Sequence, residues 1–136
     1  MISTLRFRIA GSIGIVLGAI AIFAGSSVLL ALKQPDYQVL RWLVIYNIVA
    51  GVVSALVGGA IVGLRPWATR AAVLMTSAHV LVLLILIGLR AAASPVANQS
   101  IGAMTFRSTV WLVITLLAWK LGRDAPASSN SSAHAA

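Results

Sequence analysis

The 136-residue sequence is nearly devoid of acidic residues. Asp36 and Asp124 are its only carboxylates, and neither lies in one of the four long apolar runs. Membrane proteins that move protons or metal cations usually carry an acid inside the bilayer, because a charge at that depth is expensive and is kept for function. This chain has no acid there. We therefore expect neither acid-coupled transport nor carboxylate-based hydrolysis within the membrane.

Cysteine is absent, which excludes disulfides, thiolate metal sites and thiol redox chemistry. The sequence also lacks a G-x-S-x-G turn, a Walker-type glycine loop and a pair of acids for general acid–base work. Its two histidines, His79 and His134, are too few ligands for a zinc site. We expect a protein that is not an enzyme and that carries no metal and no cofactor.

Charged residues are also scarce. They make up 9% of the chain, whereas hydrophobic residues make up 60% and the mean hydropathy is +1.03. A soluble domain carries about 25% charged residues, which solvate its surface. The apolar runs have the length of a membrane helix, about 20 residues. The predicted fold class is all-α: a polytopic membrane protein in which four transmembrane helices form a bundle within the lipid bilayer.

We place four spans, joined by short loops, within one membrane domain of residues 1–123: 9–32, 42–64, 67–89 and 101–121. The first run can also be read as a signal peptide, with basic residues before it and small residues near its end. A signal h-region has only about 7–15 residues and this run is longer, so we expect it to remain as a helix. Residues 124–136 are rich in Ala and Ser without periodicity, which predicts a disordered cytoplasmic tail.

The basic residues sit singly at the ends of the apolar runs, as charges that meet lipid headgroups do. This placement does not favour nucleic-acid binding, which needs a basic patch. Six basic residues fall on the side of the termini and four on the other side, which predicts both termini in the cytoplasm. Arginine outnumbers lysine eight to two, a composition typical of high-GC bacterial genomes. We therefore predict a multi-pass protein of the bacterial inner membrane.

Small residues recur at spacings of three and four along the first predicted helix, and a matching row lies on the second. The first row is Gly11, Gly14, Gly18, Ala21, Gly25 and Val28, and the second is Asn47, Gly51, Ser54 and Gly58. Rows of small residues let two helix backbones approach closely. We expect helix packing either between these two helices or against another subunit, through Gly11, Gly14, Gly18, Gly25, Gly51 and Gly58.

His79 lies near the middle of the third predicted helix. An ionisable side chain at that depth is a functional candidate, and a neutral imidazole can ligate haem or pair with a quinone. Haem ligation by two histidines would need a second subunit, since His134 lies in the tail. A hydrogen bond to a neighbouring helix is the alternative that we favour for His79, so it is only a weak candidate for cofactor binding.

Asn47, Tyr46 and Arg107 are expected at comparable depths on the same side of the membrane, where they can form a small polar pocket. The fourth span reaches membrane length only if it includes Arg107, about 9 Å from its first residue. The residues that we select as candidates for binding a lipid or another anionic ligand are Arg107, Asn47, Arg41 and Arg90. The alternative is ordinary contact with headgroups, to which a long arginine side chain can extend.

Three functions follow from these patterns. The leading hypothesis is a non-catalytic accessory or assembly subunit of a larger membrane complex, or a homo-oligomer, that docks through its Gly/Ala-rich helix faces. The alternative is a small carrier or binding protein for a lipid or another hydrophobic or anionic ligand held between helices. An enzyme or a haem carrier comes third. Small multidrug transporters have a similar size, but the glutamate that they need in the first helix is missing here.

Overall fold

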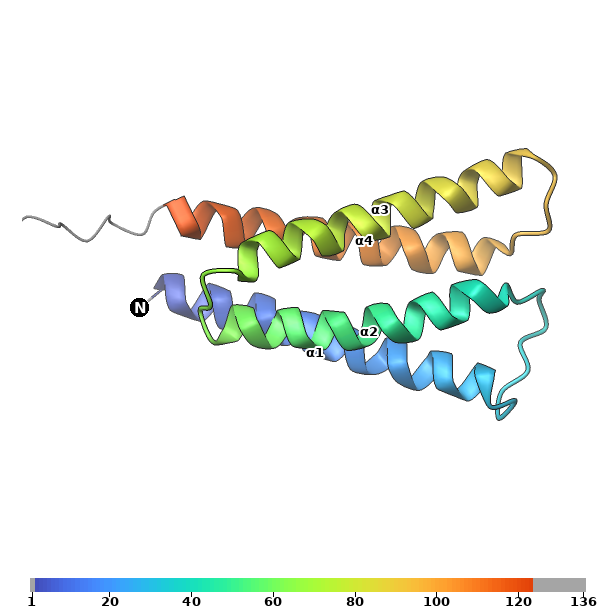
Figure 1. The fold of residues 1–136 in the computed structure, drawn as a ribbon, viewed down its shortest axis with the longest axis horizontal. Coiled ribbons are helices and arrows are strands. Elements are labelled where there is room, and N and C mark those ends of the chain that lie inside the picture. Colours follow the sequence, from blue (N-terminus) through green and yellow to red (C-terminus); the bar gives the residue numbers. More distant parts are fainter. Residues whose placement is uncertain (1, 124–136) are drawn as a thin grey trace, which may run out of the picture.

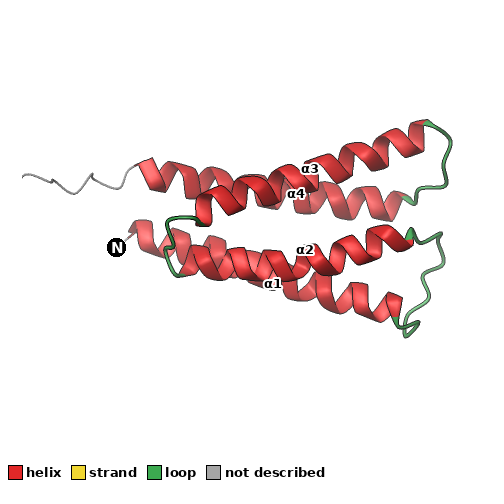
Figure 2. Cartoon of the chain, in the orientation of Figure 1, coloured by secondary structure: helices red, strands yellow, loops and turns green. Residues whose placement is uncertain are grey.

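The computed structural model describes residues 2–123, which form four long helices in an antiparallel bundle (Figure 1). The bounds are Ile2–Leu29 for α1, Arg41–Val62 for α2, Ala68–Ala91 for α3 and Asn98–Arg123 for α4. Loops and turns connect the helices, and residues 2–123 contain no strand (Figure 2). The tail that we predicted to be disordered, residues 124–136, lies outside the described residues.

The predicted fold class is confirmed. Each of the four helices is long and apolar enough to cross a membrane, so the protein sits in a lipid bilayer. The bundle consists of two hairpins, α1 with α2 and α3 with α4 (Figure 1). The two ends of the described chain lie at one end of the bundle, and the α1–α2 and α3–α4 loops lie together at the other.

α1, α2 and α3 end in the same way, with a cap that their sequences do not predict. The residue in the left-handed region just beyond each helix is not glycine: Ala31 (φ 56°), Leu64 (φ 53°) and Ala93 (φ 58°). At the end of α1, for example, the N–H of Leu32 donates to the carbonyl oxygen of Ser27 at 2.9 Å. This is the Schellman pattern, which glycine usually closes. The ends of α1 and α2 therefore precede the predicted ends by two or three residues.

The starts of two helices also differ from the prediction. α1 begins at Ile2 rather than at residue 9, because the basic residues before the apolar run do not interrupt a helix. α4 begins at Asn98 rather than at residue 101, and its first turn is closed by an N–H···O bond of 3.1 Å from Ser100 to Ala97. Arg107 therefore lies about 14 Å along α4, rather than about 9 Å from the start of the span.

α1 and α2 approach each other more closely than any other pair of helices. A Cβ atom on Gly18 would lie 2.5 Å from the carbonyl oxygen of Gly51, and one on Gly58 would lie 2.5 Å from that of Gly11. Such an approach leaves no room for a side chain. The six glycines that we expected to pack helices all face this interface: Gly11, Gly14, Gly18, Gly25, Gly51 and Gly58.

Larger side chains fill the space between the two hairpins. Trp111 of α4 is only 1% exposed and packs in the main core with Ile61 and Met75. A short polar ladder crosses from α3 to α4, where Thr76 donates to the carbonyl oxygen of Trp111 at 3.0 Å and its Oγ1 lies 2.8 Å from Oγ1 of Thr115. A second core cluster lies nearer the two loops and contains Leu43, Val82, Leu86, Val96 and Met104.

Candidate ligand-binding site

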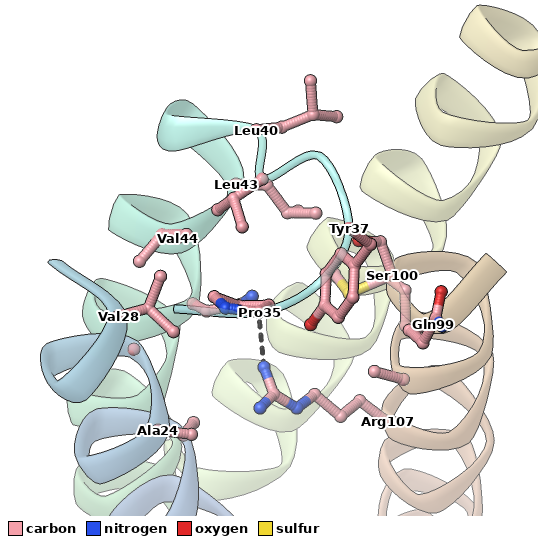
Figure 3. A pocket seen from close by; sticks show the side chains of 16 residues that line it. Ala24, Val28, Pro35, Tyr37, Leu40, Leu43, Val44, Gln99, Ser100 and Arg107 are labelled. Carbon is pink, nitrogen blue, oxygen red and sulfur yellow. Dashed lines mark hydrogen bonds between the residues drawn. The ribbon is translucent and has the colours of Figure 1, made fainter. Parts of the chain in front are cut away.

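A pocket of about 180 Å³ opens between α1, α2 and α4, at the end of the bundle that carries the α1–α2 and α3–α4 loops. Its walls are mainly apolar, and the α1–α2 loop lies across it (Figure 3). The polar groups come from the loop, from α2 and from α4. The lining residues include Val28, Pro35, Tyr37, Leu43, Val44, Asn47, Gln99, Ser100, Met104 and Arg107.

Arg107 and Asn47 meet in this pocket. Nη1 of Arg107 donates to Oδ1 of Asn47 at 2.6 Å, which is the bond marked by the dashed line in Figure 3. Asn47 lies about 9 Å along α2 from Arg41, and Arg107 lies somewhat deeper on α4. Because helical side chains point toward the N-terminus of their helix, Arg107 reaches back toward the loops and toward Asn47. Both residues are half-buried.

The charge of Arg107 is not neutralised by an acid within residues 2–123. Its hydrogen-bond partner there is a neutral amide oxygen, and the single carboxylate of this part of the chain, Asp36, lies in the exposed α1–α2 loop. Removing a guanidinium from water costs several kcal/mol unless an opposite charge compensates it. The guanidinium also has five N–H donors, of which the bond to Asn47 uses one. Among residues 2–123, the pocket therefore presents a cation without an acidic partner and with N–H donors that Asn47 does not use.

The loop side of the pocket adds polar groups that the sequence analysis did not select. The ring of Tyr37 lies next to Gln99 and Ser100 of α4 (Figure 3). A second hollow, of about 580 Å³, adjoins the pocket and shares Pro35, Tyr37 and Gln99 with it. This hollow is also lined by one cationic and one anionic side chain, Lys33 and Asp36. No periodic pattern marks these residues, because the path of a loop across a helix bundle leaves no signal in the sequence.

The other two arginines that we selected do not line the pocket. Arg41 is exposed at the first residue of α2 and lines a neighbouring surface hollow together with Lys33. Nη1 of Arg90 donates to the carbonyl oxygen of Val96 at 3.2 Å, which ties the end of α3 to the following loop. The structure therefore brings Asn47 and Arg107 together, but it does not bring Arg41 or Arg90 to them.

His79 is only 2% exposed and is held by hydrogen bonds inside the bundle. Its Nδ1 donates to the carbonyl oxygen of Met75 at 2.9 Å, and the Tyr46 hydroxyl lies 3.4 Å from the same nitrogen. The imidazole also packs against the rings of Tyr46 and Trp111. Within residues 2–123, no three side chains of His, Cys, Asp or Glu gather to hold a metal ion. The shorter of these two contacts stays within α3, and Tyr46 supplies the contact from the neighbouring helix α2, so the role of His79 stays a prediction.

Comparison of the chain with protein-family models, with curated proteins and with solved structures finds no match. The function is therefore inferred from the geometry of the pocket. Its three elements are an uncompensated guanidinium, an amide that orients it, and apolar walls at membrane depth.

Proposed function

We propose that the protein is a small membrane binding protein or carrier for an amphiphile with an anionic group, which is held between α1, α2 and α4. The hydrogen bond from Arg107 to Asn47 in a largely apolar pocket is the observation that carries this proposal. Guanidinium groups bind phosphate, sulfonate and carboxylate oxygens through paired N–H donors. An anion here would supply the countercharge that the described part of the chain does not provide.

The size of the pocket limits what enters it. An apolar cavity of about 150 Å³ holds a single benzene ring, and this pocket measures about 180 Å³. It fits one anionic group with a few carbon atoms, rather than a whole two-chain lipid. The rest of an amphiphile would extend into the adjoining hollow of about 580 Å³, past Tyr37 and Gln99.

The test is titration of the protein, in a maltoside detergent, with decanesulfonate and with decyltrimethylammonium as the cation of equal chain length. Decanesulfonate should bind, and Arg107→Gln should weaken it about 10- to 100-fold, the factor for one hydrogen bond between charged groups. Arg41→Gln is the matched control, because Arg41 is exposed and lies outside the pocket. Equal affinity for both amphiphiles, or an unchanged affinity in Arg107→Gln, would refute the proposal.

Native mass spectrometry of the gently solubilised protein identifies the source of the anion. A two-chain phospholipid and a single-chain amphiphile offer the same headgroup chemistry but differ in mass. The ligand retained by the wild-type protein should be lost from Arg107→Gln. The same spectrum reports the oligomeric state and any protein partner.

The accessory-subunit role and the cellular location stay predictions. A partner that docked on the glycine rows would have to separate α1 from α2, because these glycines face each other across the interface. A partner subunit that leaves the α1–α2 contact intact would therefore have to bind another face of the bundle. We propose the orientation that the basic residues predict, with both termini in the cytoplasm of a bacterial cell. The pocket then opens on the outer side of the inner membrane.

A further inference from the structure

A small void inside the bundle lies between His79 and Arg107, which also lines the pocket. The void measures about 10 Å³ and is lined by residues of all four helices, among them Ala21, Ser54, His79, Arg107 and Trp111. Ala21 and Arg107 also line the pocket. The void has about the volume of one water molecule. It is too small for a ligand, so His79 influences the pocket through its charge rather than by contact.

The hydrogen bond of His79 decides where a proton can bind. Nδ1 carries a hydrogen, because it donates to the carbonyl oxygen of Met75 at 2.9 Å. In the neutral ring the other nitrogen, Nε2, then holds the lone pair that accepts a proton. Histidine is the side chain that ordinarily changes charge between pH 5 and 8. Within the described helices, His79 is the only residue of this kind.

The groups that surround His79 make its charge depend on Arg107. α2 contributes the Tyr46 hydroxyl, 3.4 Å from Nδ1, and α4 contributes Arg107 across the void and the ring of Trp111. α1 contributes Leu17 and Ala21, which are apolar. A cationic imidazole would therefore stand near a second positive charge without a carboxylate. In surroundings of low dielectric constant, two such charges repel strongly.

We propose that the site takes up an anion and a proton together, with the anion on Arg107 and the proton on Nε2 of His79. The bound anion neutralises Arg107 and weakens this repulsion, which favours a proton on Nε2, although the imidazole stays buried. This inference rests on the proposed function, since it needs an anion in the pocket. Linkage then requires the reciprocal effect: a proton on His79 strengthens the binding of the anion.

The first test measures decanesulfonate affinity at pH 5 and at pH 8. A sulfonate stays ionised across this range, so any change comes from the protein. The wild-type protein should bind about tenfold more tightly at pH 5, which corresponds to one pK unit of coupling. His79→Gln should remove this difference, whereas His134→Gln, which changes the other histidine, should retain it. Equal affinity at both pH values in the wild type, or an unchanged pH effect in His79→Gln, would overturn the inference.

The second test observes the proton directly and does not depend on affinity. In the His134→Gln variant, labelled histidine gives a single imidazole, and NMR reports its protonated fraction at a fixed pH near the middle of its titration. Decanesulfonate should raise that fraction, and Arg107→Gln should raise it without ligand. Decanesulfonate that binds but leaves the fraction unchanged overturns the proton linkage and leaves the proposed function standing. If decanesulfonate does not bind at any pH, the proton linkage and the proposed function are both wrong.

Discussion

Replacing Gly18 by alanine tests the close packing of α1 on α2. The new Cβ atom would lie 2.5 Å from the carbonyl oxygen of Gly51 and 2.8 Å from the backbone nitrogen of Ala55. Ordinary van der Waals contact of a Cβ begins at 3.4 Å. The obstacles are backbone atoms, which cannot rotate away as a flexible side chain does. The helices must therefore move apart by about 0.9 Å at this point, and the contacts on either side of it loosen with them.

The expected cost combines two effects of opposite sign. Overpacking of a closely packed interface costs about 1–3 kcal/mol. Alanine is favoured over glycine inside a helix by about 0.5–1 kcal/mol, which offsets part of that cost. We therefore expect Gly18→Ala to lower the free energy of unfolding by about 1 kcal/mol, the difference between the centres of the two ranges, and by no more than about 2.5 kcal/mol. Titration with SDS in mixed micelles, followed by circular dichroism and by tryptophan fluorescence, measures this quantity.

Two other glycines make the experiment a graded one. A Cβ on Gly14 would lie 3.4 Å from both Cα of Gly58 and the ring of Trp111, which is ordinary contact. A Cβ on Gly102 of α4 would meet nothing within 4 Å. Stability should therefore rise in the order Gly18→Ala, Gly14→Ala, Gly102→Ala, and the last should equal or exceed the wild type. If Gly18→Ala is as stable as Gly102→Ala, the close approach of α1 and α2 is wrong.

Two further predictions concern the helix ends and the orientation. Ala93→Gly should raise the free energy of unfolding by about 1 kcal/mol, because φ is 58° at this position and glycine adopts this conformation without strain. Ala92→Gly is the control and should not raise it, because φ is −83° there. The same SDS titration compares the two variants, and equal effects would contradict the left-handed cap. The orientation can be tested with single cysteines, because the chain has none of its own. If both termini are cytoplasmic, Gln38→Cys should react with a membrane-impermeant maleimide on intact cells, and Ala127→Cys should react only after lysis. The reverse result would show the opposite orientation.

The sequence predicts the helices and one of their contacts well, for physical reasons. Apolar runs of membrane length have no other stable structure in a bilayer, so the four spans follow from hydropathy alone. The spacing of Gly11, Gly18, Gly51 and Gly58 also indicates a close helix contact, although it leaves the partner open. The helix ends were harder to predict, because the residues that close α1, α2 and α3 lack the glycine by which such caps are recognised.

The pocket was only partly predictable. Depth along a helix follows from the rise per residue, and this places Asn47 and Arg107 on the same side of the membrane. Whether two helices then face each other depends on rotation about their axes, which the packing of Trp111 and the glycine contacts determine. Arginines near helix ends find local partners instead, as Arg90 does with Val96.

The bond between Arg107 and Asn47 also has a consequence for biogenesis. Of the four spans, α4 is the least apolar, and it carries an arginine near its middle. An arginine at such a depth costs about 2.5–3.5 kcal/mol when a lone helix leaves the translocon. α2 precedes α4 in the chain, so Asn47 is already in the membrane when α4 is synthesised. The last helix therefore enters a half-built bundle rather than bare lipid, and the order of synthesis becomes part of how this chain folds.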